Sequence, residues 1–264
     1  DSTVAFVLPI GLTLGGSNTW SLGTARRLAE RGWKTALIEH TCVQWHPPWN
    51  VRIPAPVRRI PCPGPTPVDA TEKDVPAFAD AYRQALPGVV IPNYGAPVYA
   101  ACAQLSMENP AAIRVIGVGH GHNEANQSLL HYYEPLIHVF LVKNSVMEAD
   151  LKAKLPHRAA DIFMHPYVVD VPPSLSRAYA RPGEPLRLAY AGRITDHEKR
   201  VSNFIPLVRE LGRLGVQFTL RIIGEGGYKN WLRKEVSDLP ADLRRRVTLV
   251  DMMLPEQLDA AWRE

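Results

Sequence analysis

The fold of this chain is decided by residues 4–39, VAFVLPIGLTLGGSNTWSLGTARRLAERGWKTALIE. An apolar run at 4–9 leads through a loop with adjacent glycines into an amphipathic segment at 18–31, and a second apolar run follows at 35–39. Short apolar runs that alternate with longer helical patterns are typical of βα units and a parallel sheet. The stretch therefore predicts a strand, a helix and a second strand in that order.

The same alternation continues along the chain. Before residue 170 we expect further strands and helices, the strands at 57–61, 89–92, 115–118 and 139–142 and the helices at 75–86 and 96–107. After residue 185 the alternation starts again, with strands at 186–191, 218–223 and 247–250 and helices near 202–214, near 229–239 and from 255 onward. The chain is therefore expected to be α/β throughout.

Proline separates the two series of elements. The segment 171–185 contains four prolines together with serine and glycine, which excludes a helix and indicates a linker. We therefore expect an N-terminal domain at 1–170, a Pro-rich linker at 171–185 and a C-terminal domain at 186–264. A doubly wound domain usually has five or six strands, so the second domain, with three expected strands, is predicted to be incomplete.

Composition narrows the class of protein. Hydrophobic residues make up 46% of the 264 residues and charged residues 21%, which is typical of a soluble globular protein. No apolar run reaches the roughly 18 residues of a membrane span, so a cytoplasmic location is expected. Cys42, Cys62 and Cys102 are too scattered for a disulfide framework or a thiolate zinc site and are expected to be small packed residues.

The chain carries a formal charge of +4. A basic face can attract nucleotides, anionic lipid or nucleic acid. No nucleic-acid-binding motif accompanies the charge, so nucleic acid is not an expected partner. Peripheral contact with the inner face of a membrane stays open.

Two loops hold the first candidate ligand contacts. Gly15 and Gly16 precede the helix at 18–31, and adjacent glycines let a backbone approach an anion at a helix N-terminus. A turn that serves only chain reversal explains them equally well.

Arg193 follows the strand at 186–191, with Lys199 six positions later, and two cations at the carboxyl end of a strand can bind a pyrophosphate. Surface charges on a loop are the alternative for this pair.

The third candidate is His120, within Gly-Val-Gly-His-Gly-His at 117–122. His120 and His122 have the spacing of metal ligands, but no companion carboxylate or thiolate stands at a diagnostic distance, so no metal is expected. A polar contact to a substrate hydroxyl, or to charge that develops at a reacting carbon, suits His120 better. The other histidines, expected to be solvated or satisfied in the core, include His40, His46, His131, His138, His157 and His165.

Several segments together resemble the family-four retaining glycosyltransferases, which have the GT-B fold of two Rossmann-like domains. The resemblance lies in the Gly-Gly loop with its helix and strand, in the strand with His120, in Lys143-Asn144-Ser145, and in 165–170. It is strongest from 188 to 201, which contains Arg193 and Lys199, and the strand at 218–223 is followed by the family's Gly-x-Gly at 224–226.

The resemblance implies transfer of a sugar from a nucleoside diphosphate sugar to a hydroxyl of a carbohydrate or other acceptor, with retention. His120 would be the catalytic-site residue that contacts the donor sugar. The implied donor-binding residues are Gly15, Gly16, Arg193, Lys199, Gly224 and Met252. Gly15 and Gly16 would lie near a phosphate, and Arg193 and Lys199 would bind the diphosphate. Gly224 would contact the nucleotide, and the backbone of Met252 would contact the base. No metal or cofactor is required, because the two cations supply positive charge.

The sequence departs from the family pattern at three places. Tyr167 and Val168 replace the Asn and Gly of a Pro-Asn-Gly-Val-Asp signature, and Asp251 stands where the family usually has glycine. The family's Glu-x7-Glu segment would lie beyond Glu264. Two alternatives therefore stay open, a non-catalytic or truncated nucleotide-binding protein of this fold and a sugar-nucleotide epimerase or hydrolase.

Overall fold

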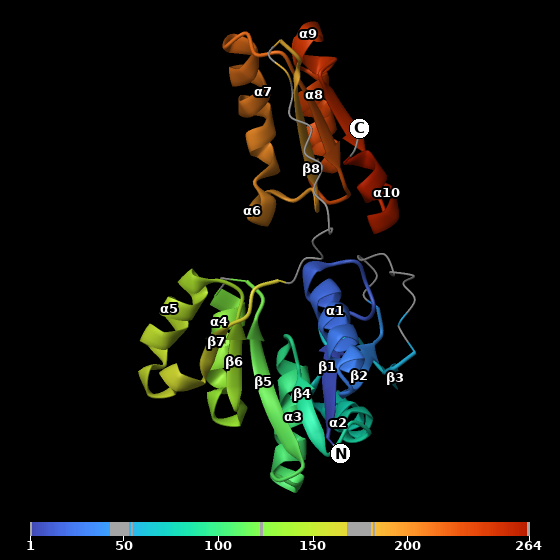
Figure 1. The fold of residues 1–264 in the computed structure, drawn as a ribbon, viewed down its shortest axis with the longest axis vertical. Helices are drawn as coiled ribbons and strands as arrows, with labels where there is room; N and C mark the ends of the chain where they lie inside the picture. The colour runs from blue at the N-terminus through green and yellow to red at the C-terminus, as the bar shows by residue number, and fades with distance from the viewer. Residues whose placement is uncertain are drawn as a thin grey trace. The chain divides into compact units, whose positions relative to one another are not determined.

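The computed structural model describes residues 2–42, 53, 55–121, 124–167, 181 and 183–262. The chain divides into two compact units, Asp1–Val171 and Pro172–Glu264, each built on a parallel sheet with helices (Figure 1). Most of the predicted linker lies outside the described residues, as do His46, His122 and Val168. The α/β prediction is confirmed in both units.

The first unit contains one sheet of seven strands in the order β3-β2-β1-β4-β5-β6-β7, all parallel. The strands are β1 (Thr3–Leu8), β2 (Lys34–His40), β3 (Val57–Cys62), β4 (Gly88–Ile91), β5 (Ile113–Gly119), β6 (Val139–Val142) and β7 (Ile162–Met164). The order reverses direction between β1 and β4. In open α/β sheets of this kind ligands bind beyond the carboxyl ends of the strands at such a switch point.

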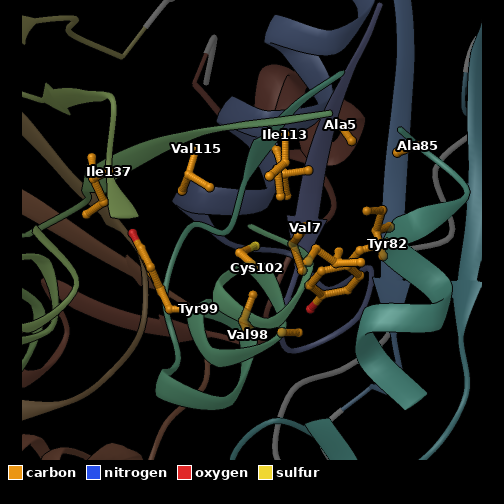
Figure 2. Close-up of a cluster of buried hydrophobic side chains, with 14 of the residues drawn as sticks. Ala5, Val7, Tyr82, Ala85, Val98, Tyr99, Cys102, Ile113, Val115 and Ile137 are labelled. Carbon is orange, nitrogen blue, oxygen red and sulfur yellow. The ribbon is translucent and has the colours of Figure 1, made fainter. Parts of the chain in front are cut away.

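Helices cover both faces of this sheet. They are α1 (Gly16–Glu30), α2 (Val75–Arg83), α3 (Ala96–Glu108), α4 (Glu124–Tyr132) and α5 (Ser145–Lys154). Alternate residues of β1 point to opposite faces, as the period of a strand requires. Phe6 and Leu8 pack with Trp20 of α1, whereas Ala5 and Val7 belong to the cluster that contains Tyr82 and Tyr99 of α2 and α3. Figure 2 shows the side chains of this second cluster.

The sequence predicted the first unit to within a few residues at each element that it named. The strand at 139–142 coincides with β6, and the expected strand at 35–39 is one residue shorter at each end than β2. Among the α-helices and strands of the described residues in this unit, α4, α5 and β7 were not predicted. The edge strand β7 has only three residues, and its Phe163 and Met164 are exposed, so it lacks the buried apolar run that identifies the other strands.

The second unit contains a three-stranded parallel sheet in the order β10-β9-β8. Its strands β8 (Leu186–Ala191), β9 (Phe218–Ile223) and β10 (Val247–Val250) agree with the predicted strands. Its helices are α6 (Asp196–Lys199), α7 (Phe204–Arg213), α8 (Lys229–Ser237), α9 (Ala241–Arg244) and α10 (Pro255–Ala261). The core joins Leu220 and Ile222 of β9 to Val208 of α7 and Leu232 of α8.

The loops after β8 and β9 cross in direct backbone contact. The Ile194 N–H donates to the Glu225 carbonyl at 2.8 Å, and the Tyr228 N–H donates to the Ile194 carbonyl at 3.0 Å. Gly224 and Gly226 have φ angles of 151° and 155°, and a Cβ on Gly224 would lie 1.9 Å from the Gly192 carbonyl oxygen. Only glycine permits this crossing, since both the φ angle and the space exclude a side chain.

The burial of the cysteines agrees with the expectation that they are small packed residues. Cys62 and Cys102 are buried, Cys42 is half-buried, and all three are free. Among the helices of the described ranges, none combines the length and apolar character that a membrane crossing needs.

The backbone crossing predicts that alanine at Gly224 and alanine at Gly227, three positions later, differ strongly in their effect on stability. Gly224→Ala should destabilise the second unit by about 3 kcal/mol or more, because it adds overpacking to backbone strain. Gly227→Ala is the control, because a Cβ at Gly227 meets nothing within 4 Å. Urea unfolding, with hydrogen exchange of the β8 and β9 amides, measures both variants. Equal stabilities of the two would contradict the close approach.

Candidate functional site

Polar side chains gather at the carboxyl edge of the seven-stranded sheet. Asn93 follows β4, His120 follows β5, Lys143 follows β6, and His165 and Tyr167 follow β7. Because the strands are parallel, their carboxyl ends meet at one edge, and the contacts below join these residues to each other and to α1. This edge includes the switch point, which is the expected location of a ligand.

Asn93 connects the loop after β4 to β1 and α1. Its backbone has φ 63°, a left-handed conformation that asparagine tolerates better than most residues. The buried side-chain nitrogen Nδ2 donates to the Val7 carbonyl oxygen at 2.5 Å and lies 3.0 Å from the Ser21 Oγ. Oδ1 of Asn93 lies 2.8 Å from Nε2 of His120. Asn93 therefore orients the imidazole of His120.

His120 is half-buried between aromatic rings. Its Nδ1 lies 3.1 Å from the Tyr167 hydroxyl, the two rings stack at 6.2 Å, and the Trp20 ring meets the imidazole edge-on at 5.4 Å. Burial, and secondly the charge of Lys143, lowers the pKa of His120 to about 3. The ring is therefore neutral at physiological pH and offers one N–H and one bare nitrogen.

Lys143 is a buried cation beside this histidine. Its Nζ lies 3.5 Å from the centre of the Trp20 ring and donates to no hydrogen-bond acceptor among the described residues. Burial lowers the pKa of Lys143 to about 7. A desolvated cation–π contact contributes about 2 kcal/mol, which is less than the several kcal/mol that burying an unpaired ion costs. Lys143 thus costs stability where it lies.

His165 completes the surroundings of Trp20. The Trp20 Nε1–H points to Nδ1 of His165 at 3.4 Å, and the His165 N–H donates to the Val142 carbonyl at 2.7 Å. Burial, and secondly Lys143, lowers the pKa of His165. His165 was expected to be an ordinary solvated or core residue and instead lies in the same cluster as His120. His40 does have the expected core role, since its Nε2 lies 2.7 Å from the buried Tyr82 hydroxyl.

Gly15 and Gly16 lie at the start of α1 with room around them. Gly15 is the N-cap, with φ −175°, and no side chain caps the helix. A Cβ on Gly15 would meet nothing within 4 Å, and one on Gly16 would meet only the Tyr167 hydroxyl, at 4.0 Å. The fold therefore does not require glycine at either position. This favours the ligand-contact hypothesis over the turn hypothesis for these two residues.

The candidate residues of the second unit lie at the ends of its strands. Arg193 follows β8, and its guanidinium pairs with the Glu198 carboxylate at 2.5 Å, with both side chains about half exposed. Lys199 is the last residue of α6 and is exposed. Gly224 lies in the crossing described above, so packing alone accounts for a glycine there. Met252 follows β10 and is 37% exposed.

Lys229 is the residue of this region that sequence reasoning missed. The buried ammonium bonds to the carboxylates of Glu225 and Asp251, the latter at 2.5 Å. Burial disfavours the charged lysine, but the two carboxylates outweigh burial and raise its pKa. Asp251 stands at the position where the sequence resemblance led us to expect glycine. It follows β10 and is a partner of Lys229, the first residue of α8. The position of Asp251 directly after a strand was the feature of the sequence that could have indicated this ion pair.

The structure places the candidates in two groups, one in each unit. His120, Gly15 and Gly16 share the sheet edge of the first unit with Trp20, Asn93, Lys143 and His165, which sequence reasoning did not select. Arg193, Lys199, Gly224 and Met252 occupy the strand ends of the second. Within the described ranges no three His, Cys, Asp or Glu side chains are grouped as metal ligands.

Comparisons with known proteins identify the fold. No protein-family model matches the chain, and no curated protein does. Among solved structures, the lipopolysaccharide outer core galactosyltransferase WaaB is 12% identical, with a TM-score of 0.68 over 99% of this chain and 71% of that one. Anabaena HepE, solved with UDP and glucose, is 12% identical, with a TM-score of 0.64 over 96% of this chain and 70% of that one.

A glycosyltransferase from Rickettsia africae is 14% identical, with a TM-score of 0.65 over 96% of this chain and 68% of that one. The chain therefore spans about 70% of the length of these three proteins. Identity this low shows the fold, which is the GT-B fold of two Rossmann-like domains, as the sequence predicted.

The open space at Gly16 predicts that alanine is tolerated there. Gly16→Ala should leave the unfolding free energy unchanged or raise it by up to about 1 kcal/mol, because alanine is the better helix former. Gly11→Ala, in the same loop, is the control that should destabilise, since Gly11 has φ 71° and its Cβ would lie 2.5 Å from the Cys42 Sγ. Urea unfolding compares them, and a large loss in Gly16→Ala would show that the fold itself needs this glycine.

The buried ammonium predicts that removing Lys143 stabilises the protein. At pH 6, Lys143→Met should raise the unfolding free energy by about 1–3 kcal/mol, because an unsatisfied buried group is removed. The folded pKa of about 7 lies below the ordinary 10.5, so the unfolded chain binds the extra proton between these values. Wild-type stability therefore rises with pH in that window, and the advantage of the variant shrinks there.

Lys154→Met, at an exposed lysine of α5, is the control for this comparison and should change little. Urea unfolding at pH 6 and pH 10 measures the variants. A destabilised Lys143→Met at pH 6 would mean that the cation–π contact outweighs burial.

Proposed function

We propose that this chain is a glycosyltransferase that moves a sugar from a nucleoside diphosphate sugar to a hydroxyl group of a carbohydrate or other acceptor, with retention of configuration. The observation that carries the proposal is the pair of exposed cations, Arg193 and Lys199, at the carboxyl end of the first strand of a Rossmann-like unit. In this reaction the bond between the anomeric carbon and the diphosphate oxygen breaks. The acceptor oxygen forms the new bond, and its proton leaves with the diphosphate.

Arg193 and Lys199 would hold the diphosphate. The pair that Arg193 forms with Glu198 is half exposed, and such surface pairs contribute at most about 1 kcal/mol, so a diphosphate displaces Glu198 at small cost. Arginine can bind two phosphate oxygens at once, and lysine adds a point charge. Their charge would stabilise the departing diphosphate without a metal or other cofactor.

The first unit would contact the sugar and one phosphate. The open backbone at Gly15 and Gly16 suits the approach of an anion to the N-terminus of α1, a helix of 15 residues. His120, neutral and half-buried, would contact the donor sugar at the reacting end. This role for His120 is polar contact and does not require a charged imidazole.

The second unit would also bind the nucleoside. Gly224 and the backbone near Met252 lie at the ends of β9 and β10, where the family places the nucleotide. The bonds from Lys229 to Glu225 and Asp251 hold these two strand ends together. Uridine is the first nucleoside to test, because HepE was solved with UDP and glucose on the same fold.

Partners other than sugars stay predictions from the sequence. An α-glucosyltransferase solved with UDP and a 13-mer DNA has a related structure, with a TM-score of 0.59 and 10% identity, so the fold by itself does not exclude nucleic acid. We expect a cytoplasmic enzyme, and its formal charge of +4 leaves peripheral contact with the inner face of a membrane open.

The diphosphate hypothesis predicts a loss of nucleotide binding. Arg193→Ala and Lys199→Ala should each weaken UDP binding about ten- to a hundredfold, which corresponds to one charge-assisted contact of about 1.5–3 kcal/mol. Arg209→Ala is the matched control, since Arg209 is exposed on α7 and away from the strand ends. Isothermal titration with UDP, GDP and ADP measures the affinities. Unchanged binding in both variants would refute the proposed diphosphate site.

Turnover separates the proposed reaction from its alternatives. UDP release that requires an added acceptor supports a transferase. Donor consumption without acceptor supports the epimerase or hydrolase alternative, and tight binding without any turnover supports a non-catalytic protein.

A further inference from the structure

Lys143 is a buried amine that no described residue satisfies. Only 7% of the residue is exposed, and its Nζ donates to no acceptor among the described residues. The amine faces two aromatic rings, with Nζ 3.5 Å from the centre of the Trp20 ring and 5.2 Å from that of Tyr167. Ring faces attract a cation but do not accept its hydrogens as a carboxylate oxygen does. The amine therefore lacks the counter-charge that a buried ammonium requires.

Lys229 shows how this protein satisfies a buried lysine that serves the fold. It is as buried as Lys143, and its ammonium bonds to the carboxylates of Glu225 and Asp251. No carboxylate in the described part of the chain does the same for Lys143. Groups that cost stability are retained where function needs them. We therefore expect the missing carboxylate of Lys143 to come from a ligand.

Lys143 lies close to the residue that is proposed to contact the donor sugar. The Trp20 ring meets both Nζ and the ring of His120, and the Tyr167 ring stacks on His120 and also faces Nζ. After burial, the charge of Lys143 is the second cause that lowers the pKa of His120. Lys143 follows β6 at the same sheet edge and has a flexible stem. A sugar that contacts His120 therefore brings its substituents close to Nζ.

Tyr167 is the covering group that a ligand can displace. Its side chain is 41% exposed, and it is not part of the core clusters of its unit. Trp20, in contrast, is buried in the core with Phe6 and Leu8 of β1. Movement of Tyr167 would thus uncover the amine while Trp20 stays in place.

We propose that Lys143 binds a carboxylate group of the ligand, so that an acidic sugar such as a hexuronic acid is the substrate class of this protein. This role rests on the proposed function, in which a sugar is transferred, and the carboxylate belongs to the donor sugar or to the acceptor. One lysine among neutral rings cancels a single negative charge, whereas a phosphate monoester carries about −1.5 to −2 at pH 7. Charge matching therefore favours a carboxylate over a phosphate.

Nucleotide sugars test the donor as the source of the carboxylate. UDP-glucuronate has a carboxylate where UDP-glucose has a hydroxymethyl group. At pH 6 the wild type should bind UDP-glucuronate about ten- to a hundredfold tighter, as one charge-assisted contact implies. Lys143→Met should lose this preference and bind UDP as before, whereas Lys154→Met, at an exposed lysine of α5, should keep it. Isothermal titration measures the affinities.

Free sugars test the acceptor as the source. Glucuronate should bind tighter than glucose, with or without UDP, and Lys143→Met should again lose the difference. A preference in neither pair of ligands, or one that survives in Lys143→Met, overturns the inference, as does tighter binding of glucose 6-phosphate than of glucuronate. Failure of the wild type to bind UDP contradicts the proposed function instead, and the free sugars then decide the role of Lys143 alone.

Proton uptake is a readout that a purely structural lysine would not give. Burial lowers the pKa of Lys143 to about 7, and a bound carboxylate raises it again. Binding of the acidic sugar should therefore take up close to one proton at pH 8 and almost none at pH 6. Titration in buffers of different ionisation enthalpy measures this uptake.

The other titratable groups near Lys143 do not replace it as the proton acceptor. They are His120 after β5, and His165 and Tyr167 after β7. Burial is the first cause that lowers the pKa of both histidines and raises that of Tyr167, so at pH 8 the histidines are neutral and the phenol is protonated. Uptake at pH 8 that persists in Lys143→Met would assign the proton to a histidine and overturn the inference.

Discussion

The bond from the Asn93 side chain to the Val7 carbonyl is the interaction on which the first unit's site depends. It joins the loop after β4 to β1, the two strands between which the sheet reverses direction. Together with the bond to the Ser21 hydroxyl, it orients the Asn93 amide, whose oxygen in turn contacts the His120 ring. The switch point of the fold is thus also the point at which backbone geometry decides side-chain chemistry.

The same edge of the sheet holds a group that opposes folding. Lys143 keeps its ammonium over Trp20 without a carboxylate or carbonyl partner among the described residues. Strained or costly groups persist where the surroundings overdetermine them, and they are concentrated at functional sites. In the second unit Lys229 is also buried but has two carboxylates, so the two lysines differ in their consequence. Lys229 holds two strand ends together, whereas Lys143 is an unpaired buried amine beside a candidate reaction site.

The sequence predicted what depends on local pattern. The strands β6, β8, β9 and β10 were found because each is a short apolar run with clear boundaries. The short edge strand β7 and the polar helix α4 were missed because neither has a buried periodic face in the sequence.

Site residues could likewise be predicted where local sequence position marks them, and not where distant contacts define them. Gly16, His120 and Arg193 follow strands or open a helix, so their positions in the sequence single them out. Trp20 does not, because its partner His165 is 145 residues away and the pairing arises only when the sheet has formed. Asn93 acts through contacts 72 and 86 residues distant and could not be predicted locally.

The backbone crossing in the second unit limits how this protein can diverge. Because the Ile194 N–H and carbonyl bond to Glu225 and Tyr228, the loop that bears Arg193 and the glycine loop have one joint conformation. An insertion in either loop would displace the other, so new nucleotide preferences are more accessible through side chains than through loop length. The Glu225 side chain is also fixed, because its carboxylate bonds to the buried ammonium of Lys229. Related chains should therefore preserve the spacing of the two glycines between the crossing loops.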